Sequence, residues 1–117
     1  MNLNNFTIKG KDTLNQAGQI AMAMGNQAIE TGHILKAIQA LKSQEAGFEM
    51  YVMLGAWIDC QGAWSQNQPN HDIEDQENNN SEITKAITLA NQYPDIVKII
   101  SVGNEAMVHW ATSYFVR

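Results

Sequence analysis

The first half of the chain carries apolar residues at the three- and four-residue spacing of amphipathic helices. The first stripe follows Thr7, a predicted N-cap, and we expect Gly25 to end that helix in the left-handed conformation. The second stripe follows Thr31, also a predicted N-cap, and Gly47 is expected to close it. The pattern therefore predicts a helical hairpin. The apolar positions are Leu14, Ala17, Gly18, Ala21 and Met24, then Ile34, Leu35, Ile38 and Leu41.

The second half of the chain has a different period. Residues 48–58 (FEMYVMLGAWI) and 96–102 (IVKIISV) are short, nearly continuous apolar runs. Such runs are typical of strands buried on both faces of a parallel sheet. With a helix between them, they predict one βαβ unit with parallel strands. The fold class is therefore α/β, with an N-terminal helical hairpin followed by a single βαβ piece.

A polar stretch separates the two apolar runs. Residues 59–80 are predicted to form a long loop, and Asn79 or Ser81 is predicted to cap the helix that follows. Tyr93-Pro94 is expected to end that helix. Its predicted apolar face consists of Ile83, Ala86, Ile87 and Ala90.

Composition narrows the classes of function. The chain has 117 residues, far fewer than the roughly 250 of a complete eight-stranded α/β barrel. Its net charge of −5 argues against a nucleic-acid partner, which needs a basic surface. Residues 1–5 resemble no secretory signal, and no apolar run reaches the length of a membrane span, so we expect a cytoplasmic protein without a membrane partner.

The best-placed candidate for chemistry is Glu105, which follows the second predicted strand in the sequence VGNE. Functional groups of α/β barrels lie at the C-terminal ends of strands, and partial burial there could raise the pKa of a general acid. Asn104 could position a substrate hydroxyl. The alternative is that Glu105 is a solvated residue of an ordinary strand-to-helix loop.

Two segments of the second half, MLGAWID and NNNSEITKAITLANQYPDIVKIISVGNEAMVHW, resemble the interior of a family-seventeen glycoside hydrolase of the β-1,3-glucanase type. The resemblance covers roughly residues 42–117 and implies an incomplete piece of a (β/α)8 barrel. It implies that Glu105 is the acid/base residue, that Asn104 holds the sugar, and that Trp57 and Asp59 line the cleft. A β-glucan oligosaccharide is the implied partner.

The chain departs from that family in one important respect. Retaining glycosidases need two carboxylates about 5–5.5 Å apart. The family carries its nucleophile on a later strand, and the sequence has only 12 residues after Glu105. We therefore expect a glycoside-hydrolase-like fragment that is inactive alone.

The first half resembles a different family. The segments MNLNNFTIK and QAIETGHILKAI are similar to the start of a ClpB-type chaperone N-terminal domain, over roughly residues 1–41. This resemblance implies a module that binds unfolded proteins or peptides, although no Walker motif is present. The chain thus divides into residues 1–41 and 42–117. Three alternatives follow: the chain functions as the glycoside-hydrolase-like fragment, it functions as the chaperone-like module, or it is a chimeric reading frame with no selected function.

Other groups are weaker candidates. An acidic cluster after residue 70 could hold a divalent cation, but it lacks the spacing of a calcium loop, so we expect a solvated loop, no metal and no cofactor. Cys60 and His71 form no recognisable nucleophile pair, and Cys60 is expected to be a partly buried small apolar residue. The acidic cluster is His71, Asp72, Glu74, Asp75 and Glu77, and the remaining histidine and tryptophan candidates are His33, His109, Trp64 and Trp110.

Overall fold

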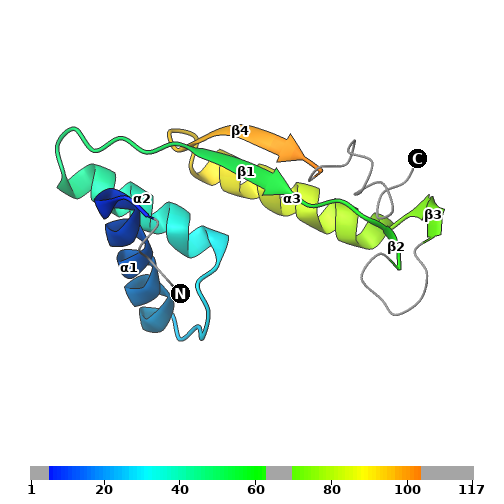
Figure 1. Ribbon diagram of the computed structural model, residues 1–117, viewed down its shortest axis with the longest axis horizontal. Coiled ribbons are helices and arrows are strands. Elements are labelled where there is room, and N and C mark those ends of the chain that lie inside the picture. The colour runs from blue at the N-terminus through cyan, green and yellow to red at the C-terminus, as the bar shows by residue number, and fades with distance from the viewer. Residues whose placement is uncertain (1–5, 63–69, 104–117) are drawn as a thin grey trace. The chain divides into compact units, whose positions relative to one another are not determined.

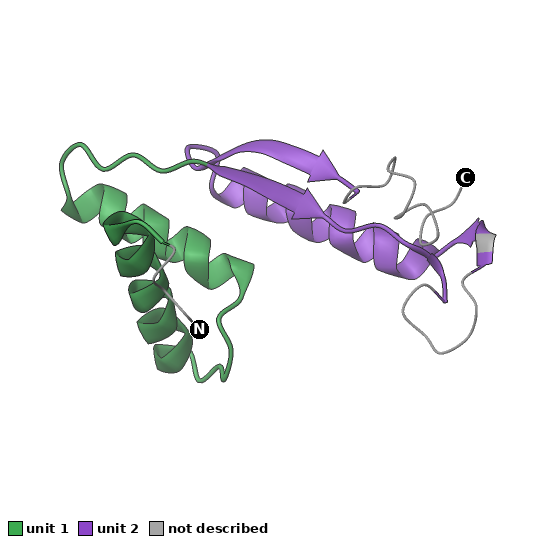
Figure 2. Ribbon diagram, viewed as in Figure 1, with its two compact units in different colours: residues 1–51 green, residues 52–117 purple. Residues whose placement is uncertain are grey.

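A computed structural model of the chain describes residues 6–62 and 70–103. The chain forms two compact units, Met1–Tyr51 and Val52–Arg117 (Figure 2). Two helices make up the described part of the first unit, and one helix with two small sheets makes up that of the second (Figure 1). The mixture of helices with a small parallel sheet confirms the α/β class.

Helix α1 (Ile8–Ala23) begins and ends where the sequence predicts. The Thr7 hydroxyl accepts a hydrogen bond from the Gly10 backbone N–H at 3.0 Å, so Thr7 is the N-cap. Gly25 follows the helix with φ +75°, the left-handed conformation that glycine adopts without strain. Ala17 and Ala21 are buried, and their small side chains let α1 pack against α2 (Figure 1).

Helix α2 (Thr31–Gln44) has Glu30 as its N-cap, so the prediction of Thr31 is wrong by one residue. The reason lies in His33, whose Nδ1 accepts the Glu30 backbone N–H at 2.9 Å. The other ring nitrogen, Nε2, lies 3.0 Å from the side-chain amide nitrogen of Asn26. His33 is 4% exposed and is therefore part of the structure of this turn. The other buried residues of α2 are Leu35, Ala37 and Ile38.

The apolar run 48–58 is divided between the two units. Phe48 is buried in the first unit, where the Lys9 ammonium lies 4.7 Å from the centre of its ring. The same ammonium forms an ion pair with Glu45 at 2.7 Å. Only residues 52–56 of the run form a strand, so the predicted strand over 48–58 is too long. Periodicity alone could not show this division, because a buried aromatic in a loop and one in a strand look alike.

Strands β1 (Val52–Ala56) and β4 (Val97–Val102) pair in parallel, as predicted, with Leu54 beside Ile100. Helix α3 (Gln76–Gln92) packs against both strands (Figure 1). Leu54 is 7% exposed but its neighbour Met53 is 67% exposed, because alternate residues face opposite sides and α3 covers one side. The prediction of strands buried on both faces is therefore wrong for the described residues.

The polar stretch 59–80 is not a loop throughout. Strand β2 (Cys60–Gln61) pairs in antiparallel fashion with β3 (Asn70–Glu74), and α3 already begins at Gln76. Asp75 is the N-cap, since its carboxylate accepts the Asn78 N–H at 3.1 Å. The predicted caps Asn79 and Ser81 both lie inside the helix. Hydrogen bonds between the Asn79 side chain and the Asp59 backbone compensate for the poor helix propensity of asparagine.

The buried stripe of α3 differs from the predicted one. Asn79, Ala86 and Tyr93 recur every seven residues on its buried side, and Tyr93 is its C-cap, next to Pro94 as predicted. Ile83 and Ile87, expected in the core, are 37% and 50% exposed. A two-stranded sheet covers only a narrow stripe of a helix, so the flanks of α3 remain bare. None of the helices in the described ranges is long and apolar enough to cross a membrane.

Candidate functional site

A hollow of about 230 Å³ lies at the C-terminal end of the parallel sheet. Gly103 ends β4 with φ +80°, and its N–H donates to the Ala56 carbonyl at 2.9 Å, which closes the strand pairing. The hollow includes Met53 and Gly55, which belong to the face that α3 does not cover. In α/β barrels this end of the strands carries the chemistry. The hollow is lined by Met53, Gly55, Ala56, Trp57, Ser101 and Gly103.

Trp57 is the aromatic side chain of this hollow and directly follows β1. Its backbone N–H donates to Glu82 Oε2 at 3.2 Å, and its indole Nε1–H donates to Asp59 Oδ1 at 3.2 Å. The residue is nonetheless 42% exposed. Trp57 is therefore held at its backbone and at its ring while much of its surface remains accessible.

Asp59 is buried and serves as the hub of the site. Its backbone N–H donates to Asn79 Oδ1 at 2.7 Å. Its carbonyl accepts from Asn79 Nδ2 at 3.0 Å and from the Asp75 N–H at 3.0 Å. The Asn79 amide thus occupies both backbone groups of Asp59, as a neighbouring strand would. The Asp59 carboxylate holds the indole of Trp57.

Two residues of this arrangement, Asn79 and Glu82, were not predicted to belong to a site. The sequence predicts Asn79 only as a possible cap of α3, whereas Asn79 and Glu82 both bond to the segment after β1. The signal for Asn79 was present in the run Asn78-Asn79-Asn80, because asparagine is a poor helix former. Three of them inside a helix indicate that tertiary hydrogen bonds compensate for the low propensity.

Cys60 lies beside this arrangement and is fully buried. Burial raises the pKa of its thiol above the usual value, and the charges of Asp59 and Asp75 raise it further. Its own backbone hydrogen bond acts in the opposite direction. Because the thiolate is the nucleophile, these effects make Cys60 a poor one at neutral pH.

Trp57 and Asp59, the two residues predicted to line a cleft, are joined by a hydrogen bond in the structure. Asn104 and Glu105 lie outside the described residues, immediately after Gly103 in the sequence. Among the described side chains, no group of three or more His, Cys, Asp or Glu residues converges as a metal site would. The predicted residues that also lie outside the described ones are Trp64, His109, Trp110 and the side chain of His71.

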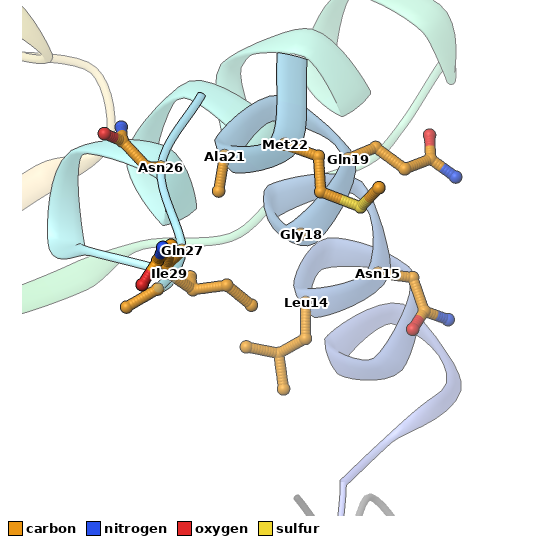
Figure 3. A pocket seen from close by; sticks show the side chains of 10 residues that line it. Leu14, Asn15, Gly18, Gln19, Ala21, Met22, Asn26, Gln27 and Ile29 are labelled. Atoms are coloured by element: carbon orange, nitrogen blue, oxygen red, sulfur yellow. The ribbon is translucent and has the colours of Figure 1, made fainter. Parts of the chain in front are cut away.

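The first unit contains a second hollow, of about 420 Å³, between α1 and the segment that links it to α2 (Figure 3). Leu14, Gly18 and Ile29 supply apolar surface, and none of the residues that line the hollow is ionisable. Any ligand would therefore be recognised by apolar contact and neutral hydrogen bonds. The amide side chains at this hollow are Asn15, Gln19, Asn26 and Gln27.

Comparison with known proteins finds similarity to two different proteins. The chain is similar to the crystal structure of an endo-laminarinase from Formosa Hel1_33_131, with 49% sequence identity and a TM-score of 0.71 over 91% of this chain. The match exceeds residues 42–117 and so extends into the first unit. The chain is also 50% identical, over 38 residues, to the chaperone protein ClpB of Porphyromonas gingivalis (strain ATCC BAA-308 / W83).

Both similarities concern a part of a longer protein. The chain spans 28% of the laminarinase chain and 4% of the ClpB protein. No protein-family model matches the sequence. The resemblance to a glycoside hydrolase is therefore supported by structure and sequence together, and the ClpB resemblance by one short segment.

Proposed function

We propose that the second half of the chain is part of a β-1,3-glucan-binding cleft of the glycoside-hydrolase type. The observation that carries the proposal is the hollow at the strand ends, lined by Trp57, in a chain 49% identical to an endo-laminarinase over the matched part. The exposed indole can stack on the apolar face of a sugar ring. Glu105 is proposed as the acid/base residue and Asn104 as a group that holds a sugar hydroxyl.

By the same reasoning, we propose that the isolated polypeptide does not hydrolyse β-1,3-glucan. A retaining mechanism needs a second carboxylate about 5–5.5 Å from the first. Asp59 is a poor candidate for that role, because it is buried and its carboxylate accepts the hydrogen bond of the Trp57 indole. We therefore propose a glucan-binding fragment that carries the acid/base residue and lacks the nucleophile.

The test is an assay of the purified 117-residue chain on laminarin. We expect no release of reducing sugars, together with saturable binding of laminari-oligosaccharides measured by calorimetry. Glu105→Gln is the matched variant, because it keeps the size of the side chain and removes the acid. Turnover that disappears in Glu105→Gln would show that the chain is a working enzyme, and absence of binding would remove the proposed function.

A second candidate function is peptide binding by the helical half. It is favoured by the 50% identity with ClpB over 38 residues and by the hollow beside α1, which no ionisable residue lines. An extended apolar peptide labelled with a fluorophore is the probe. Ile29→Asp, inside the hollow, should abolish binding, whereas Ile8→Asp, on a residue 79% exposed and outside the hollow, should not. If neither peptide nor glucan binds, the chimeric reading frame without selected function remains.

A further inference from the structure

We infer that Asn79 is a positioning residue for Trp57, acting through Asp59, and that it holds the indole as a rigid platform for a sugar ring. The inference rests on the proposed glucan binding and deepens it. It assigns a positioning role to Asn79, near the start of helix α3, whereas the sequence alone predicted a helix cap there. Asn79 itself is not among the residues that line the hollow.

The geometry of Asn79 is specific for an asparagine. The residue is 8% exposed, and its amide oxygen and nitrogen bond the N–H and the carbonyl of the same residue, Asp59, at 2.7 and 3.0 Å. Alanine would leave both buried backbone groups of Asp59 without these partners. Aspartate would keep the acceptor and lose the donor, and glutamine would place the amide one methylene too far away.

Two other side chains of α3 form hydrogen bonds with the backbone of Trp57, two residues before Asp59. Glu82, three residues after Asn79, accepts the Trp57 N–H at 3.2 Å. Asn78 donates to the Trp57 carbonyl at 3.4 Å. Helix α3 therefore holds the backbone of residues 57–59 at both ends, and the Asp59 carboxylate holds the indole nitrogen.

The combination of rigid attachment and exposure points to a ligand. Trp57 lines the hollow and is 42% exposed, although tryptophan is highly buried on average. An aromatic surface that is already immobilised loses little entropy when a ligand stacks on it. Such preorganisation suits a neutral sugar, which offers C–H groups to the ring and no charge for stronger attraction.

The experiment uses the full chain with Trp64→Phe and Trp110→Phe, so that all tryptophan emission comes from Trp57. The variants are Asn79→Ala and its matched control Asn80→Ala, an exposed neighbour in the same helix. The first measurement is time-resolved anisotropy without ligand, which reports how freely the indole moves. The second is titration with laminari-oligosaccharide, followed by the same emission.

We expect Asn79→Ala to increase the amplitude of nanosecond indole motion and to weaken oligosaccharide binding by about 3- to 10-fold, the effect of one or two hydrogen bonds. Asn80→Ala should change neither quantity. Equal indole mobility in the two variants would overturn the positioning role, whether or not glucan binds. Absence of binding in the parent, with increased mobility in Asn79→Ala, would instead reject the proposed function and retain the positioning role.

A second pair of variants decides the question if Asn79→Ala fails to fold. Asp59→Asn keeps an oxygen that can accept the indole N–H, whereas Asp59→Ala does not. We expect the indole to remain immobile in Asp59→Asn and to become mobile in Asp59→Ala. A merely structural role would alter the unfolding midpoint without this difference between the two substitutions, so identical mobility would contradict the inference.

Discussion

The two units of this chain keep their residues in place by different means. In the first unit, the core is made by close packing of two helices, and Ala17, Leu35 and Ala37 have no exposed surface. In the second unit, Met53 and Ile99 of the parallel sheet are 67% and 58% exposed. Order at its strand ends comes instead from side chains that bond to backbone groups. Packing therefore dominates in the helical unit, and hydrogen bonding dominates at the strand ends of the second unit, beside the hollow that Trp57 lines.

The largest effect should come from truncating the helical core. Leu35 has no exposed surface, so Leu35→Ala should lower the free energy of unfolding of the first unit by about 2–5 kcal/mol. Ile99→Ala is the control in the sheet and should cost less than about 1 kcal/mol, because its side chain is mostly exposed. Urea denaturation followed by circular dichroism measures both. A larger cost at Ile99 would show that the sheet face is covered in solution.

A smaller effect should come from the hydrogen-bonded clamp of the second unit. Asn79→Ala removes both hydrogen bonds between the Asn79 amide and the buried backbone of Asp59, whose carbonyl keeps its bond from the Asp75 N–H, and we expect a loss of about 1–3 kcal/mol. Asn80→Ala should instead stabilise by a few tenths of a kcal/mol, since alanine is the better helix former at an exposed position. The unfolding midpoints of the two variants are compared with that of the parent. Equal midpoints would contradict the clamp.

The helix caps test the contribution of local sequence to the first unit. Thr7→Ala removes the acceptor for the Gly10 N–H and should cost about 1 kcal/mol. Ser43→Ala removes a hydroxyl that bonds only within its own helix, to the Gln39 carbonyl, and should be nearly neutral. Thermal unfolding distinguishes them. A loss at Ser43 as large as that at Thr7 would mean that the cap has no special role.

The smallest effect concerns Cys60 and depends on pH. Its folded-state pKa is raised above the ordinary value of 9.0, so the unfolded chain loses the thiol proton first as pH rises. The stability contributed by the protonated thiol is complete below pH 9.0 and is lost as pH rises through the folded-state pKa. Cys60→Ser should remove this part of the decline, which is measured as the difference between the two unfolding curves from pH 7 to 10. Parallel curves would contradict the raised pKa.

Much of the fold follows from the sequence, because local signals decide it. The cap at Thr7, the left-handed Gly25 and the end of α3 at Tyr93-Pro94 all lie where propensity places them. The parallel pairing of β1 and β4 was predicted from their apolar character. The start of α3 was not, because Asn79 bonds to a residue 20 positions away.

The candidate site was predictable in part. Trp57 and Asp59 were selected by resemblance, and the hydrogen bond between them could not be deduced from spacing, since it needs the chain to turn after β1. Glu82 was missed for a similar reason, because a glutamate near a helix start is more often a cap or a surface residue. The roles of Asn104 and Glu105 stay predictions from the strand-end position and the resemblance.

The parallel pairing of β1 with β4 also has a consequence for folding on the ribosome. Val52 pairs with Val97, so the partner of Val52 is synthesised 45 residues later. At about 5–20 residues per second, β1 waits some 2–9 s for its partner. The helical unit, whose two helices are neighbours in sequence, is complete before that interval begins. During the wait, β1 is an unpaired strand, and α3, which is synthesised between the two strands, can cover its apolar face before β4 emerges.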